Sequence, residues 1–349
     1  MLTNAYDEFI DAHIHLFDLK GTPRPMQPLG KMFGWNDKLL RRAAARLMPA
    51  ETVAFFGLRT DLLGDYLPAH FAADSGSSRV ARYVHIQAGW TDDKPLDPVG
   101  ETAWLSQLSN GPAAIVAHAD LELGLDVDRV LQAHLAVSDR VRGVRHMLSW
   151  HAASSVMNFA GKSDLSRTAA FRAGFDRLAE HNLSYDAWSY SGQIGQVAEL
   201  AGHNPEVPIV LCHVGTPVGY GGEFGGVGVS AQERARIGDE WRDAISALAE
   251  HRHVYCKLSG LLMPVLGFGF EDAAKARLDQ LVERLTPIVE HCVDSFGVDR
   301  CIVASNFPVD RVAVDYDTLI EAMVEMTARY GPEAQHAMFA GNAAAFYRL

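Results

Sequence analysis

Short runs of apolar and β-branched residues alternate with longer amphipathic stretches along nearly all of the 349-residue chain. This alternation is typical of a parallel sheet whose strands are linked by helices. The runs that we interpret as strands are 9–17, 80–88, 114–120, 141–148, 183–190, 207–215, 253–261 and 300–307. Helical periodicity falls between them at 125–137, 166–181, 193–203, 231–251 and 273–296. The pattern predicts an α/β fold, a (β/α)8 TIM barrel with its active site at the carboxyl ends of the strands.

We expect one domain over residues 1–349, because the chain shows no internal repeat, low-complexity tail or linker. Three connections are longer than simple barrel loops: residues 18–79, 216–230 and 262–270. They follow the first, sixth and seventh strands, so they would extend over the catalytic face, and we predict that they act as lids. The glycine-rich second segment lacks the Lys-Ser/Thr pair of a phosphate-binding loop.

Charge and apolar distribution limit the classes of partner. The formal net charge is -12, and no run of Lys or Arg compensates it locally, which disfavours nucleic acid and anionic membranes. No apolar stretch has the length of a membrane span, and no signal peptide is recognised. The four cysteines lack CxxC spacing and are predicted to be reduced. We therefore expect a cytoplasmic protein that binds a small, anionic molecule; the oligomeric state, a homo-oligomer included, stays open.

Three histidines stand where predicted strands end. His13 and His15 are two residues apart in one strand, so their side chains project to one face about 7 Å apart. His213 ends the sixth strand, where the apolar run breaks into a glycine-containing loop. Such a set could hold Zn²⁺ with an open position, or polarise a carbonyl group without metal. His251 and His253 have the same spacing but precede the seventh strand, on the stability face, so we expect no catalytic role for them.

Six further side chains are candidates for substrate binding: Arg145, His146, His151, Trp188, Tyr190 and Lys257. Arg145 lies near the end of the fourth strand, and its planar guanidinium suits a carboxylated substrate, although a salt bridge to a helix is the alternative. Lys257 lies inside the seventh strand, where a charged group needs either a buried partner or a ligand. Trp188 and Tyr190 could line the pocket or belong to the core.

Short motifs spread over the chain carry a resemblance to a known family. They are 11–18, 143–146, 213–217, 257–261, 296–300, 305–308 and 341–347. With them the chain resembles the amidohydrolase superfamily, specifically its amidohydrolase-2 branch of 2-pyrone-4,6-dicarboxylate lactonases and sugar lactonases. The resemblance implies a (β/α)8 barrel and hydrolysis of a cyclic ester. The branch includes metal-independent lactonases, so one weakly bound divalent metal and metal-free catalysis both stay open.

The eighth strand departs from the family pattern. The resemblance implies an aspartate there that takes a proton from the attacking water, but this chain has Asn306. An amide is no general base near neutral pH, although it donates and accepts hydrogen bonds. We expect Asn306 to donate to an anionic substrate. The candidates for the base are Asp310, His146 and His151.

These observations predict an ester hydrolase that opens a lactone bearing a carboxylate or hydroxyl groups. His13, His15 and His213 would polarise the carbonyl group directly or through one metal ion, with Asn306 and Asp310 beside them. The alternatives are a decarboxylase or carbon–carbon hydrolase acting on an aromatic-derived acid, and a non-catalytic binder that has lost its base. Fold alone does not decide among them.

Overall fold

The computed structural model describes residues 8–56, 63–76, 80–91, 93–272 and 276–349. In these ranges, eight parallel strands follow one another in chain order around one sheet. The strands are β1 (Ile10–Ile14), β2 (Arg82–Ile86), β3 (Ala114–Ala117), β4 (Val141–Val144), β5 (Ser184–Ala187), β6 (Ile209–Leu211), β7 (Val254–Leu258) and β8 (Cys301–Val303). Each lies within a run that the sequence predicts.

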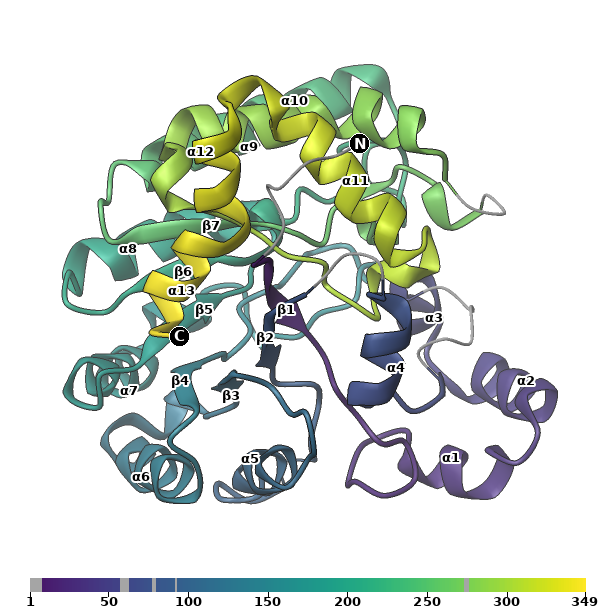
Figure 1. The fold of residues 1–349 in the computed structure, drawn as a ribbon, viewed down its shortest axis with the longest axis vertical. Helices are drawn as coiled ribbons and strands as arrows, with labels where there is room; N and C mark the ends of the chain where they lie inside the picture. Colours follow the sequence, from purple (N-terminus) through teal and green to yellow (C-terminus); the bar gives the residue numbers. More distant parts are fainter. Residues whose placement is uncertain (1–7, 57–62, 77–79, 92, 273–275) are drawn as a thin grey trace.

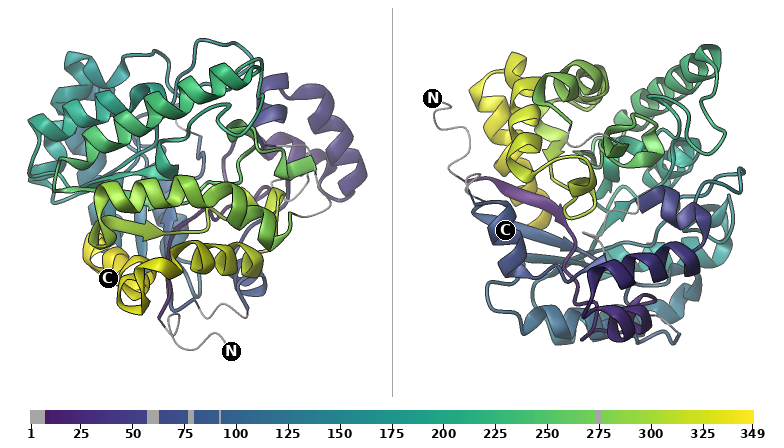
Figure 2. Two further views of the ribbon diagram at one scale, coloured as in Figure 1. Left: turned by 90° about the horizontal axis from the view of Figure 1, so that it is seen from above. Right: turned by 90° about the vertical axis from the view of Figure 1, so that its right-hand side faces the viewer.

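The sheet closes between β1 and the chain that leaves β8. The backbone amide of Asn306 donates to the carbonyl of His13 at 2.9 Å, and that of His15 donates to Phe307 at 2.8 Å. Ile14 and Phe307 form a parallel bridge. The sheet is therefore a nearly closed barrel surrounded by helices (Figures 1 and 2), which confirms the (β/α)8 prediction.

Among the described residues, six α-helices connect the strands from β2 to β8, and the last five lie where the sequence predicts helices, with small changes at their ends. They are α5 (Val99–Ser106), α6 (Val127–Val137), α7 (Ala169–Glu180), α8 (Ile194–His203), α9 (Ala231–Ala249) and α10 (Leu278–Phe296). Side-chain caps explain two starts, since Thr168 accepts from the amide of Phe171 and Ser230 from that of Glu233. The first residues predicted for α10, 273–275, lie outside the described residues. After β8 follow α11 (Tyr316–Thr327), α12 (Pro332–His336) and α13 (Asn342–Tyr347).

The long connection after β1 is largely helical. It contains α1 (Gln27–Phe33), α2 (Asp37–Leu47), α3 (Ala50–Phe56) and α4 (Pro68–Asp74), while 57–62 and 77–79 lie outside the described residues. The ring of Phe55 in α3 lies 6.0 Å from that of Trp188, which follows β5. This connection therefore reaches the carboxyl end of the barrel.

The other two long connections pair with each other. The amide of Gly219 donates to Val265 at 3.0 Å, and that of Gly221 donates to Leu266 at 2.8 Å. The residues Pro264–Leu266 in turn contact α3. The three long connections thus pack together at the carboxyl end; that they act as lids stays a prediction.

Two apolar layers position the site. Inside the barrel, one cluster contains Ile10, Ala12, Val84, Ile86, Val116, Val210 and Ile302. Phe346 and Tyr347 of α13 belong to the same cluster, so the last helix packs on the barrel interior (Figure 1). A larger cluster fills the space between the strands and the outer helices.

The structure also bears on two further predictions, one about membrane-spanning segments and one about the cysteines. Among the described residues, no helix combines the length and the apolar character that crossing a membrane requires. All four cysteine thiols are buried and free, which agrees with the prediction that they are reduced.

Candidate active site

A bulge in β1 turns His13 into the barrel. The register of β1 against β2 shifts by one residue between Asp11 and Ile14, so Ala12 and His13 together oppose one partner. Such a bulge re-aims the side chain that it inserts. As a result His13 faces His15, with their Nε2 atoms 3.2 Å apart. The face that carries both histidines thus depends on the bulge as well as on strand alternation.

Asp11 holds this bulged strand in place. Its buried carboxylate accepts from the backbone amide of His13 at 3.2 Å and from that of Ser305 at 3.0 Å. It also accepts from the hydroxyl of Tyr316 in α11 at 2.7 Å. Asp11 therefore joins β1, the segment after β8 and an outer helix, which makes it a structural support for His13.

A left-handed turn brings His213 to the same place. Residues 213–216 have φ angles of 55, 49, 72 and 38°. Positive φ is uncommon for residues other than glycine, and Val214, a β-branched residue, is an outlier there. Such strained backbone occurs preferentially at functional sites. The turn places the ring centroid of His213 4.4 Å from that of His13.

The motif after β7 supports the His213 ring. The hydroxyl oxygen of Ser259 lies 2.9 Å from Nδ1 of His213. Gly260 has a φ of 63°, and a Cβ atom there would lie 2.5 Å from the His213 ring. A glycine is thus required at 260 both by its backbone and by the imidazole beside it.

The three imidazoles are buried and neutral at neutral pH. Their exposed fractions are 0% for His13, 8% for His15 and 2% for His213. Burial is the main reason that the pKa of each ring lies well below its usual value of 6.5. Cations nearby lower these pKa values further, Lys257 that of His13 and Arg145 those of the other two.

Lys257 has a buried partner inside the protein, the first of the two alternatives that its sequence position left open. Its Nζ lies 2.6 Å from Oδ2 of Asp186, and both side chains are fully buried. The same Nζ lies 3.3 Å from Nδ1 of His13. The hydroxyl of Tyr347 donates to Asp186 at 2.9 Å. The ammonium group is therefore held between a carboxylate and the histidine cluster.

No role was predicted for Asp186 or Tyr347. For Asp186 a signal existed, because it lies on the same face as Trp188, two residues further along, and is the buried carboxylate of β5. For Tyr347 there was none. Its contact with Asp186 joins residues 161 positions apart.

Arg145 is buried beside the cluster without a carboxylate. Its exposed fraction is 5%, and its Nη2 donates to the carbonyl of Gln87 at 2.6 Å. The guanidinium carbon lies 5.7 Å from the ring centroid of Trp188, whose Nε1 donates to Thr216 at 3.1 Å. The Nε of Arg145 has no hydrogen-bond partner, and no ion pair with a described carboxylate is found. Arg145 is thus a cation available to an anionic ligand.

Two of the predicted histidines lie apart from this cluster. His146 follows Arg145 and alternates to the outer face, where its ring lies 5.5 Å from that of Phe171 in α7. His151 is half-buried in a loop, and its Nδ1 accepts from the amide of Ala153 at 3.1 Å. Its ring lies 6.5 Å from that of Tyr190.

Tyr190 is buried within the large apolar cluster, and its hydroxyl donates to the carbonyl of Met157 at 2.5 Å. That it lines a pocket stays a prediction. His253 directly precedes β7, and the carbonyl of His251 accepts from Arg300 at 3.0 Å. Since Arg300 precedes β8, both of these histidines lie at the amino ends of the strands, opposite the three-histidine cluster.

Asn306 and Asp310 form a buried pair next to β1. Asn306 has a φ of 58°, and its Nδ2 donates to Oδ1 of Asp310 at 2.9 Å. The amide of Leu262 donates to Oδ2 at 3.3 Å. Burial raises the pKa of Asp310 to about 7. One amide N–H of Asn306 is therefore directed at a protein carboxyl group, whereas the sequence predicts that it donates to an anionic substrate.

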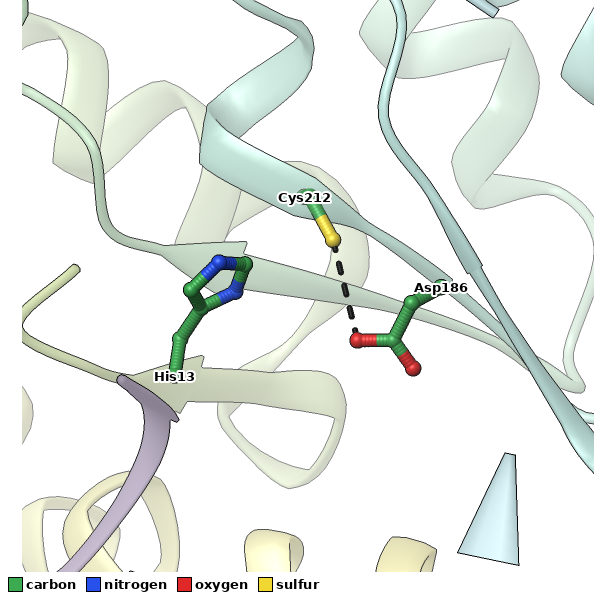
Figure 3. A group of neighbouring side chains, drawn as sticks. All are labelled: His13, Asp186 and Cys212. Atoms are coloured by element: carbon green, nitrogen blue, oxygen red, sulfur yellow. Dashed lines mark hydrogen bonds between the residues drawn. The ribbon is translucent and has the colours of Figure 1, made fainter. Parts of the chain in front are cut away.

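The described residues offer two groups of ligand atoms for a divalent metal ion. His13, Asp186 and Cys212 have such atoms within 4.8 Å of one another (Figure 3), and so do Asp120, Glu122 and His146. In the first group the Asp186 carboxylate is already paired with Lys257. Burial raises the pKa of the Cys212 thiol to about 12, so it is protonated and contacts Asp186 at 3.7 Å.

The histidines fit a metal ion only in part. A metal-bound imidazole normally donates its other N–H to an acceptor. His15 meets this condition, because its Nδ1 lies 2.8 Å from the carbonyl oxygen of Ile86. His13 does not, because its Nδ1 faces the Lys257 ammonium group, which only donates. The set of His13, His15 and His213 therefore does not fit a metal ion bound through all three rings.

Comparison with known proteins adds relatives across the whole chain. The profile of a family described as Amidohydrolase matches residues 10–349. An uncharacterised protein of Sinorhizobium fredii, y4mH, is 32% identical over 97% of this chain and 98% of its own. An L-fucono-1,5-lactonase of Burkholderia ambifaria is 27% identical over 97% of this chain and 95% of its own. A crystal structure of an amidohydrolase from Burkholderia multivorans with bound zinc has a TM-score of 0.70 at 22% identity, covering 98% and 99% of the two chains.

Proposed function

We propose that this chain, which belongs to the amidohydrolase family, opens the ring of a lactone that carries an anionic group. The observation that carries the proposal is the convergence of three neutral, buried imidazoles beside a buried arginine that lacks a carboxylate partner. The L-fucono-1,5-lactonase among the relatives supports the reaction class. Because the three rings are at most 8% exposed, we expect the packed connections above the barrel to move when a substrate enters.

The histidines would polarise the carbonyl group of the lactone. A neutral imidazole that donates a hydrogen bond stabilises the negative charge that develops on this oxygen when water adds. Burial strengthens that interaction, since bulk water does not compete for the donor. Removal of one such donor costs about 10²–10³ in kcat in other enzymes.

Asp310 would serve as the general base, with Asn306 orienting it. A carboxyl group with a pKa of about 7 matches the working pH of a proton acceptor. Asp310 takes a proton from water while the oxygen of that water forms a bond to the lactone carbonyl carbon. The ring C–O bond then breaks, and the same proton passes to the leaving alkoxide, which gives a hydroxy acid.

The second part of the proposal concerns the binding of a divalent metal ion. We expect zinc to bind weakly, at well under one equivalent in protein purified without added metal. Three imidazoles bring no negative charge, and the carboxylate beside His13, that of Asp186, is occupied by Lys257. No step of the proposed reaction passes through a metal ion.

The first test is turnover of a panel of lactones by the wild type and by His213→Asn. We expect the variant to lose about 10²-fold or more in kcat, because one donor to the carbonyl oxygen is lost. The matched control is His251→Asn, at the opposite end of the barrel, which should keep wild-type kcat. Release of CO2 from aromatic acids with no ring opening of any lactone would favour the decarboxylase alternative and contradict the proposal.

Arg145→Lys should impair a carboxylated lactone while sparing a neutral one of the same ring size. Lysine keeps the charge but loses the planar fork, so kcat/KM should fall roughly 30-fold, about 2 kcal/mol. Arg140→Lys is the control, because Arg140 precedes β4 and donates to the carbonyl of Pro112. Equal losses on both lactones would demote Arg145 to a structural role.

A further inference from the structure

The contacts of Lys257 determine where His13 carries its proton. Nζ of Lys257 lies 3.3 Å from Nδ1 of His13 and 2.6 Å from the carboxylate of Asp186, with which it forms an ion pair. An ammonium group has three donors and no acceptor, so Nδ1 of His13 must accept. A neutral imidazole that accepts on Nδ1 carries its hydrogen on Nε2.

The same reasoning extends to His15. Nε2 of His13 lies 3.2 Å from Nε2 of His15, so the latter accepts and His15 carries its hydrogen on Nδ1. That nitrogen lies 2.8 Å from the carbonyl oxygen of Ile86, which only accepts. The ammonium group of Lys257 at one end can only donate, and the carbonyl oxygen of Ile86 at the other can only accept. All hydrogen bonds between them therefore run in one direction.

We propose that Lys257 is a positioning residue that takes the place of an active-site metal ion. It holds His13 as the Nε2–H tautomer, so that this nitrogen donates to His15 and has no lone pair for a metal. The tautomer and the competition with metal follow from the contacts alone.

Lys257 disfavours metal binding because of where it leaves the lone pair of the His13 ring. For His13 to ligate a metal through Nε2, its proton would have to move to Nδ1, where it would face an N–H of the ammonium group. The charge of Lys257 would also repel the dication directly. Removing the ammonium group would reverse both effects and free the Asp186 carboxylate as a further ligand.

The first experiment reads the tautomer in the wild-type protein. Long-range ¹H–¹⁵N spectra of protein labelled with ¹⁵N-histidine distinguish a protonated ring nitrogen from one with a lone pair, and His13→Gln assigns the signals of His13. We expect a proton on Nε2 and a lone pair on Nδ1 at pH 7. A proton on Nδ1 overturns the proposal.

The second experiment titrates Zn²⁺ into wild type, Lys257→Met and Arg236→Met by calorimetry. Arg236 pairs with Glu240 at 2.7 Å but is 60% exposed, and neither belongs to the two groups of metal-ligand atoms, so its loss should leave zinc affinity unchanged. We expect Lys257→Met to bind zinc roughly tenfold or more tightly than wild type. Equal affinities contradict the proposal; if Lys257→Met does not fold, the wild-type spectrum decides. Neither readout requires lactone turnover, so failure of the proposed function would be seen separately.

Discussion

Asp310→Asn is expected to lower kcat for lactone opening by about 10²–10⁴-fold, the range that general base catalysis contributes. The variant keeps the size of the side chain and an acceptor for Asn306 but removes the group that takes the proton from water. Its exposed counterpart is Asp299, just before β8, and Asp299→Asn should keep wild-type kcat.

The pH dependence distinguishes this role from a structural one. A base works only when deprotonated, so wild-type kcat/KM should be low in acid and rise through pH about 7, the pKa to which burial raises Asp310. The residual activity of Asp310→Asn should lack this rise. An unchanged profile in the variant would show that another group is the base.

The free energy of unfolding gives an independent measurement of the protonation of Asp310. Its pKa is about 7 in the folded protein against 3.8 as the ordinary value, so its stabilising contribution is present in full below pH 4 and is lost as the pH rises through 7. The loss amounts to roughly 4 kcal/mol for a shift of this size. Urea unfolding at pH 5 and pH 8 should therefore show a smaller decrease in the free energy of unfolding for Asp310→Asn than for wild type.

Lys257→Met is expected to lower the free energy of unfolding by about 3–5 kcal/mol, because it leaves the Asp186 carboxylate buried without its cation. Lys162→Met breaks an ion pair of the same 2.6 Å length between side chains that are 45% and 37% exposed. For that surface pair a loss of at most about 1 kcal/mol is expected. Urea unfolding at pH 7 compares the two directly.

A double variant separates the charge from the packing. In Lys257→Met/Asp186→Asn the unpaired charge is gone, while Tyr347 still has an oxygen to which it donates. We expect this protein to be more stable than Lys257→Met alone. If both single lysine variants lost equal stability, or the double variant recovered none, the buried ion pair would not be the stabilising interaction that the structure indicates.

The sequence alone determined the barrel and the strand ends that carry the site. Strand and helix periodicity are local properties, so all eight strands and the helices from α6 to α9 could be predicted within a few residues. The histidines were found for the same reason, since His13, His15 and His213 stand at the ends of apolar runs. In a barrel all such ends meet at one face, so their convergence follows from topology.

Only the tertiary structure decided which groups support them. The bulge in β1 depends on pairing with β2, and alternation by itself gave no sign of it. Asn306 was recognised as a departure from the family, but its bond to Asp310 depends on a left-handed residue at the strand end. His146 was placed among the substrate-binding candidates, yet alternation after Arg145 turns it toward α7.

The contacts of the buried pair of Lys257 and Asp186 were the hardest feature to predict from the sequence. Lys257 lies 71 positions from Asp186 and 244 from His13, and Tyr347 lies 161 from Asp186. A buried charge requires a partner, and the sequence showed that requirement for Lys257. Which partner satisfies it depends on the side chains that β1, β5, β7 and α13 bring into one interior. Propensity and periodicity describe neighbours along the chain, whereas this choice is made by packing among residues far apart in it.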